Sequence, residues 1–162
     1  MTDAELRKAL SYDEKTGEFR WLASHGRAKK GSIAGCIGLC NGRRYRLIGL
    51  HGDMYLAHRL AWLYKTGHWP DRDIDHADGN GLNNSWANLR LATRTENNAN
   101  ARLRKDNTTG HKGVVAGWGG RFLARIQVAG KNRHLGTFDT IEQAAEAYRK
   151  AAKEAFGDFA NA

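Results

Sequence analysis

Alternation of apolar and polar residues in the first part of the chain predicts several short elements. A capping box and one apolar side predict a short helix at residues 2–10. A turn signal within residues 12–21 predicts a small hairpin. Residues 45–50 and 54–56 alternate as two strands, and residues 58–66 have the apolar spacing of a helix that ends at a glycine. These pieces predict a β-rich support layer.

The C-terminal part of the chain carries a different pattern. Residues 113–116, 121–129 and 133–138 are short alternating segments separated by turns, so they predict three strands. Residues 141–156 place apolar side chains, many of them alanines, at helical spacing before Gly157. The alanines would let this helix approach a sheet closely. The chain as a whole therefore predicts an α+β protein.

The groups that could carry chemistry lie between these two parts, within residues 74–98. His76 can act as a neutral general base, Asp75 beside it as a hard oxygen ligand, and Asn97 as a second, uncharged oxygen ligand. The Gly- and Asn-rich residues 79–84 cannot sustain a helix and predict a wide loop. This set of groups is what metal-dependent hydrolysis of a phosphodiester requires.

A second capping box, Thr93-x-x-Glu96, places Asn97 in the first turn of a helix. We expect that helix to run to about Arg104, with its positive dipole end near the ligand, where phosphate is also attracted. Glu96 is an alternative ligand to Asn97. Its position three residues after Thr93 favours a capping role instead.

Four motifs in this region carry a family resemblance: Ile-Asp-His-Ala-Asp-Gly-Asn at 74–80, Asn-Asn at 83–84, Asn-Leu-Arg at 88–90 and Glu-Asn at 96–97. They resemble HNH endonucleases of the phage and homing type, in the HNN variant whose last His is Asn. The spacings of twelve residues from His76 to Asn88 and nine from Asn88 to Asn97 fit that family.

The resemblance implies an N-terminal ββα-metal domain that cleaves DNA, as a nicking or double-strand-cleaving enzyme of homing type. It assigns His76 as the general base and Asn88 as a catalytic-site residue that braces the loop and orients His76. It assigns Asp75 and Asn97 as ligands of one divalent ion, Mg²⁺ or alternatively Mn²⁺. That ion would neutralise charge on the leaving oxygen. The alternative is a non-catalytic DNA-binding regulator that keeps the ββα shape, and cleavage of supercoiled plasmid separates the two.

The C-terminal segments resemble the Apetala-two/ethylene-response-factor DNA-binding domain over residues 107–162. That resemblance implies a small three-stranded antiparallel sheet packed on one helix, with the sheet in the major groove. Two contact positions depart from the family, because Arg125 stands where a Glu is usual and His134 where a Trp is usual. The predicted organisation is a nuclease domain at 1–104, a linker at 105–110 and this ERF-like domain at 111–162.

Charge supports a nucleic-acid partner. The 162-residue chain has a net charge of +9 and a sequence pI near 9.8, which suits a polyanion. Residues 98–134 hold eight basic residues and one acid, Asp106. We expect double-stranded DNA as the partner and no organic cofactor. The predicted DNA-binding residues are Arg59, Arg102, Arg104, Lys105, Trp118, Arg121, Arg125 and Arg133.

Two further features leave alternatives open. Cys36 and Cys40 lie four apart in a glycine-rich stretch, and structural zinc would need His51 or His58 as well. That spacing is not typical of a finger, so two reduced thiols in a small hairpin are favoured. His58, next to Arg59, could line the site, but a His at the start of an amphipathic helix more often packs or caps.

The remaining expectations concern location and assembly. No apolar run approaches the length needed to cross a bilayer, and the N-terminus is charged from Asp3 onward. We therefore expect a soluble, cytoplasmic monomer, which would act in the host cell if it is phage-encoded.

Overall fold

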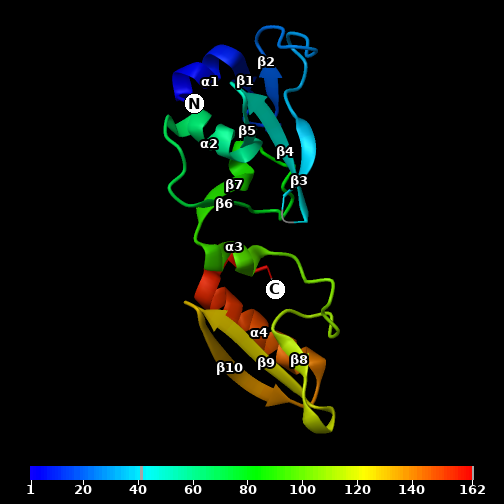
Figure 1. Cartoon of the computed structure of the whole chain (residues 1–162). Coiled ribbons are helices and arrows are strands. Elements are labelled where there is room, and N and C mark those ends of the chain that lie inside the picture. Colours follow the sequence, from blue (N-terminus) through cyan, green and yellow to red (C-terminus); the bar gives the residue numbers. More distant parts are fainter. Residues whose placement is uncertain (41, 162) are drawn as a thin grey trace. The chain divides into compact units, whose positions relative to one another are not determined.

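The computed structural model describes residues 1–40 and 42–161 (Figure 1). The chain divides into two compact units, Met1–Leu91 and Ala92–Ala162. Helices and small antiparallel sheets occur in both, which confirms the α+β class. This division differs from the predicted boundary at residues 105–110, because the helix after Thr93 groups with the second unit. Among the described residues, no helix combines the length and apolar character that a bilayer crossing demands.

The N-terminal part of the chain is built from short elements that form three small sheets. β1 pairs with β2, β4 lies between β3 and β5, and β6 pairs with β7. The elements are α1 (Asp3–Ala9), β1 (Leu10–Tyr12), β2 (Phe19–Trp21), β3 (Cys36–Cys40), β4 (Arg43–Leu50), β5 (Asp53–Leu56), α2 (Ala57–Thr66), β6 (Asp73–His76), the 3₁₀ turn η1 (Trp86–Asn88) and β7 (Leu89–Ala92).

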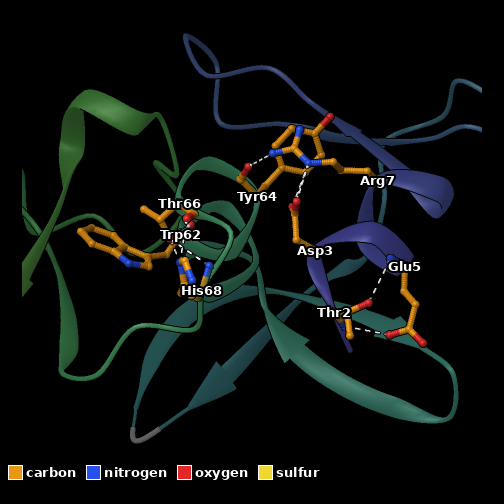
Figure 2. A network of polar contacts seen from close by, with 8 residues as sticks. All are labelled: Thr2, Asp3, Glu5, Arg7, Trp62, Tyr64, Thr66 and His68. Atoms are coloured by element: carbon orange, nitrogen blue, oxygen red, sulfur yellow. Dashed lines mark hydrogen bonds and ion pairs between the residues drawn. The ribbon is translucent and has the colours of Figure 1, made fainter.

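Figure 2 shows the contacts at the start of α1 and its contact with the last turn of α2. The Thr2 hydroxyl accepts from the Glu5 amide at 3.3 Å, and the Glu5 carboxylate accepts from the Thr2 amide at 2.7 Å, so the predicted capping box is confirmed. Arg7 pairs with Asp3 at 2.8 Å and also donates to the Tyr64 carbonyl near the end of α2. Arg7 thereby ties α1 to α2.

One apolar core supports the strands that carry the candidate chemistry. Leu6, Phe19 and Leu60 are fully buried in it, and they come from α1, β2 and α2. Ile74 of β6 and Leu89 of β7 belong to the same cluster. Burying such side chains contributes roughly 1.5–3 kcal/mol each, so β6 and β7 are anchored by the core and not only by their own pairing.

The glycine-rich stretch contains a strand whose bounds the sequence pattern did not give, although a small hairpin was favoured for its two cysteines. Residues 36–40 form β3, which pairs with β4 in antiparallel register from Cys36 opposite Leu47 to Cys40 opposite Arg43. Gly38 permits close packing, because a Cβ there would lie 2.5 Å from a methyl group of Leu47. Of the stretch 31–42, Asn41 lies outside the described residues.

The second unit is a three-stranded antiparallel sheet, in the order β10-β9-β8, with α4 packed on one face (Figure 1). Its apolar cluster joins Val114 and Ala124 of the sheet to Ala144 and Ala145 of α4. The small alanines give the close approach that the sequence predicted. The elements are α3 (Arg94–Asn100), β8 (Val114–Ala116), η2 (Trp118–Gly120), β9 (Phe122–Val128), β10 (Lys131–Phe138), α4 (Ile141–Phe156) and η3 (Gly157–Phe159).

The helix expected to run from Thr93 to about Arg104 is shorter than predicted. Its capping box forms, with the Thr93 hydroxyl accepting from the Glu96 amide, but α3 ends at Asn100 and Ala101 is extended (φ −57°, ψ 145°). Asparagine competes for backbone hydrogen bonds, and three of the seven residues of α3 are Asn, so the helix is weakly sustained. Arg102 and Arg104 therefore lie beyond it.

Candidate active site

Strand β6 delivers Asp75 and His76, both of which are buried. The Asp75 carboxylate accepts a hydrogen bond from Nε of Arg90 on β7 at 2.9 Å and forms an ion pair with Nη2 of the same guanidinium at 2.8 Å. Both reach the Oδ2 atom. Such charge-assisted bonds fix the direction of a carboxylate. Arg90 thus holds Asp75 in one orientation across the β6–β7 pair.

The loop after His76 is held by a network centred on Asp78. The Asn88 side chain accepts from the Asp78 amide at 3.0 Å and donates to Asp78 Oδ1 at 3.0 Å and to the Asn83 carbonyl at 2.8 Å. Partial burial alone would raise the pKa of Asp78, but hydrogen bonds from Asn83, Asn80 and Asn88 outweigh it and lower that pKa. Asn88 therefore braces the loop, and its amide nitrogen makes both of its hydrogen bonds in doing so.

The His76 ring is hydrogen-bonded to Asn84, a residue that the sequence pattern placed only in a loop. Its Oδ1 lies 3.3 Å from Nε2 of His76. Burial lowers the pKa of His76, and the Asn84 hydrogen bond together with the carboxylates of Asp78 and Asp75 offsets only part of that effect. His76 is consequently neutral near pH 7, the state that a general base needs.

His58 also lines this site. Its ring lies 5.0 Å from the His76 ring, edge to face, and 5.4 Å from the ring of Tyr45 on β4. His58 is 7% exposed, and its Nδ1 finds no hydrogen-bond partner among the described residues. Burial lowers its pKa from 6.5 to about 3, with the neighbouring His76 and Arg59 adding to the effect. The geometry makes His58 a neutral packing partner of His76.

This buried histidine predicts a loss of stability in acid. The unfolded chain binds a proton at His58 near pH 6.5, whereas the folded chain binds it only near pH 3. The free energy of unfolding should therefore fall as the pH drops from about 6.5 toward 3. In His58→Phe the fall should be shallower, with the exposed His111→Phe as the control. Denaturant unfolding at pH 5 and pH 7.5 measures this, and equal pH dependence in both variants would contradict it.

The metal ligands proposed from sequence lie in different units. Asp75 is on β6, and Asn97 is half-buried on α3 in the second unit, so their pairing stays a prediction. Among the described residues, no three His, Cys, Asp or Glu side chains gather as a metal-binding group. Mg²⁺ needs only one or two carboxylates besides water and phosphate oxygens. The buried, oriented carboxylate of Asp75 fits that requirement.

The predicted DNA contacts of the N-terminal unit and of the segment after α3 have varied surroundings. The Arg59 guanidinium lies 6.0 Å from the centre of the Trp69 ring, so it already has a cation–π partner. Arg102 and Lys105 are exposed. Arg104 is also exposed and forms an ion pair with Asp106 at 2.9 Å. A pair this exposed is weak enough for a phosphate to replace it.

The strand register divides the predicted contacts of the C-terminal sheet between its two faces. Arg125 lies opposite His134, and both are exposed. Arg133 lies opposite Ile126, which is buried. Directly opposed residues of an antiparallel pair project to the same face, so Arg133 lies on the face against which α4 packs and Arg125 on the other. The Arg133 side chain is nevertheless exposed. His134, and not Arg133, therefore lies beside Arg125, and contact of Arg133 with DNA stays a prediction.

Two other predicted contacts lie near the edge of this sheet. Trp118 in η2 is 97% exposed, the largest exposure among the large hydrophobic side chains of the described residues. Arg121, immediately before β9, forms an ion pair with Asp139 at 3.3 Å in which both side chains are largely exposed. Both side chains are therefore accessible to a ligand.

The first unit also contains a basic segment that was not singled out from the sequence. No acid lies between Glu18 and Asp53, and several of the bases there belong to the β3–β4 hairpin, next to exposed Leu39. β4 also carries Tyr45, whose ring lies 6.0 Å from the His76 ring. The absence of acids over this range was the signal in the sequence. The basic residues are Arg20, Arg27, Lys29, Lys30, Arg43, Arg44 and Arg46.

The two cysteines are both free and exposed in β3. Cys36 and Cys40 are the first and last residues of this strand, which separates them by about 13 Å at 3.3 Å per residue. Zinc–sulfur bonds are about 2.3 Å long, so one ion cannot bind both thiols in this conformation. The strand geometry therefore disfavours the zinc alternative.

The order of elements and the residues on them define a class of protein. β6, β7 and α3 follow one another as strand, strand and helix, with Asp75 and His76 on the first strand. Residues 55–99 match the HNH endonuclease family, and this range contains Asn84, Asn88 and Asn97 as well. The chain belongs to the HNH endonuclease family, as its motifs predicted.

Two viral proteins are similar to this chain. Uncharacterized HNH endonuclease L560 of Acanthamoeba polyphaga mimivirus is 36% identical over 110 residues, which cover 67% of this chain and 57% of that protein. Protein 3.8 of Escherichia phage T7 is 38% identical over 90 residues, which cover 54% of this chain and 72% of that protein. The chain thus spans little more than half the length of the mimivirus relative. The family match ends before the C-terminal sheet begins.

Proposed function

We propose that this protein is a metal-dependent DNA endonuclease that hydrolyses phosphodiester bonds. The observation that carries the proposal is a buried, neutral His76 beside the oriented carboxylate of Asp75, within the range that matches the HNH endonuclease family. A nicking or double-strand-cleaving enzyme of homing type, acting as a monomer on double-stranded DNA, is the form that the resemblance supports.

In the proposed reaction His76 takes the proton from the attacking water. Asp75 and Asn97 would hold one divalent ion, Mg²⁺ or Mn²⁺, which when bound supplies stabilisation of negative charge on the phosphate and the leaving oxygen. Arg90 keeps the Asp75 carboxylate oriented, and Asn88 keeps the loop in place. Purified protein should convert supercoiled plasmid to nicked or linear DNA with Mg²⁺ and leave it intact with a chelator.

The second candidate function is a non-catalytic DNA-binding regulator. The exposed face of the C-terminal sheet, which carries Arg125 and His134, favours DNA binding without requiring chemistry. Specific DNA binding with no plasmid cleavage at any divalent-metal concentration would support this candidate over a nuclease.

We propose that both units contact DNA. In the second unit the exposed sheet face would read the groove, with Arg121 and Trp118 at its edge, while the exposed residues after α3 would follow the phosphate backbone. In the first unit Arg43 and Arg44 would bind phosphates from the hairpin beside the site. Arg59 would join them by leaving its Trp69 contact.

Salt dependence tests these contacts. Arg125→Gln should weaken DNA binding and flatten the plot of log affinity against log salt by about 0.9 if one phosphate contact is lost. The double variant Arg43→Gln/Arg44→Gln should flatten it by about 1.8 on the same basis. Arg149→Gln on α4, whose partner is Glu146, is the matched control. Gel-shift affinities at several salt concentrations measure the slopes. Slopes equal to that of the control would show that the substituted residues do not contact DNA.

A further inference from the structure

The Asn84 side chain has one defined orientation, and this decides what it offers to His76. Asn84 is 1% exposed, and its amide nitrogen donates to the Leu82 carbonyl at 3.2 Å. A carbonyl oxygen can only accept, so the nitrogen of the Asn84 amide must face Leu82 and the oxygen must face His76. The group that lies 3.3 Å from His76 Nε2 is therefore an acceptor.

An acceptor at this position selects one form of the neutral imidazole. A neutral ring carries its proton on one nitrogen and a lone pair on the other, and the hydrogen bond made by one nitrogen sets the role of the other. Because Asn84 Oδ1 accepts from Nε2, the proton lies on Nε2 and the lone pair on Nδ1. The proton from the attacking water must then be received at Nδ1.

Asn84 is itself held by the N-terminal hairpin, about seventy residues earlier in the chain. The Tyr12 hydroxyl donates to the Asn84 carbonyl at 2.7 Å, and burial raises the pKa of Tyr12, which keeps that proton in place. Gly17 (φ +74°) packs against the same peptide group: a Cβ there would lie 2.2 Å from the Asn84 carbonyl carbon. The Trp86 amide donates to the Glu14 carbonyl at 2.8 Å. This hairpin thus contacts the loop at Asn84 and again two residues later at Trp86.

We infer that Asn84 is a positioning residue that fixes His76 as the Nε2–H tautomer, and that Tyr12 and Gly17 of the N-terminal hairpin hold Asn84 in place for this purpose. The role of His76 as base rests on the proposed function. The tautomer does not, because it is a property of the folded protein without metal or DNA.

The first test is spectroscopic and uses the full chain. Nitrogen-15 labelling of histidine, with two-bond proton–nitrogen correlations, reports which ring nitrogen of His76 carries the proton. The signals of His76 are assigned by their loss in His76→Gln. We expect the proton on Nε2 in the wild type. A proton on Nδ1 would overturn the inference whether or not the protein cleaves DNA.

Variants of similar size at Asn84 separate its effect on the His76 tautomer from a general effect on folding. Asn84→Asp and Asn84→Leu both lose the donor to Leu82, but only Asn84→Asp keeps an acceptor for Nε2–H. We expect Asn84→Asp to keep the Nε2–H tautomer and Asn84→Leu to show a mixture of tautomers. In Asn84→Leu kcat should fall about 10–100-fold with little change in KM, the usual cost of losing such a partner. Equal kcat and equal tautomer populations in the two variants would overturn the inference.

Two further variants keep the inference testable if Asn84→Leu does not fold. Tyr12→Phe removes only the hydroxyl that holds the Asn84 backbone, so the chain should stay folded while the His76 signals broaden and kcat falls. Asn98→Leu, an exposed asparagine of α3, is the control for the tautomer measurement. Unchanged His76 signals and unchanged kcat in Tyr12→Phe would show that the hairpin does not position Asn84.

Discussion

Replacing His76 by alanine is expected to lower DNA cleavage by a factor of about 10² to 10⁴ while leaving DNA affinity nearly unchanged. The imidazole is buried beside Asn84 and His58, where it can take a proton from water but does not lie on the exposed basic surfaces. Single-turnover cleavage of plasmid and gel-shift affinity, measured on the same preparations, separate the two effects.

The matched control for this variant is His111→Ala, because His111 is exposed and lies in the second unit. His111→Ala should cleave at the wild-type rate. Cleavage by His76→Ala at that rate would show that another group removes the proton. A loss of both cleavage and binding would instead point to a folding defect, which thermal unfolding of the variant would reveal.

Removing the Asp75 carboxylate is expected to raise the metal concentration needed for half-maximal cleavage by at least about tenfold. Loss of a residue that only orients a metal ligand typically lowers metal affinity by about 10–100-fold, and loss of the ligand itself should lower it at least as much. Asp75→Asn keeps the shape of the side chain and removes its charge. Asp73→Asn on the same strand is the control, since Asp73 is exposed. Titration with Mg²⁺ and Mn²⁺ after chelation measures the requirement, and Asn97→Ala tests the second proposed ligand in the same way.

The outcome has to be separated from a loss of stability. Arg90 lies partly buried against Asp75, so Asp75→Asn deprives the guanidinium of a charged partner. A thermal melt without metal shows how far folding is affected. If titrations of Asp75→Asn and Asn97→Ala both coincide with that of the wild type, the metal lies elsewhere.

Sequence reasoning located this site because its signals are local. A strand that ends in Asp75 and His76, an Asn-rich loop and the Thr93 capping box each depend on residues close together in the chain. The length of α3 was overestimated because the capping box predicts only where the helix begins. The asparagines of α3 sustain a helix poorly, so it ends early. The bounds of β3 were not predicted, because the glycine-rich residues there are stabilised as a strand by pairing with β4.

Long-range contacts were less accessible to sequence reasoning. The pairing of Asn84 with His76 lies within one loop, but the contact that fixes Asn84 comes from Tyr12, on another hairpin. Similarly, Arg133 looked equivalent to Arg125 until the register set it opposite Ile126. The face of the sheet to which a side chain projects depends on the pairing with the neighbouring strand. Alternation along one strand does not predict that face across a β-bulge, such as the one between His134 and Gly136.

Ile74 and Leu89, the residues that flank the site on β6 and β7, are part of the main apolar core of the first unit. A site built in this way has no separate melting transition: the segment that carries His76 can leave its place only when the core itself opens. Heating should therefore produce a sharp loss of the active geometry at the midpoint of cooperative unfolding, and little gradual decline below it. Protection of the β6 amides from hydrogen exchange should accordingly approach the value for global unfolding of that unit.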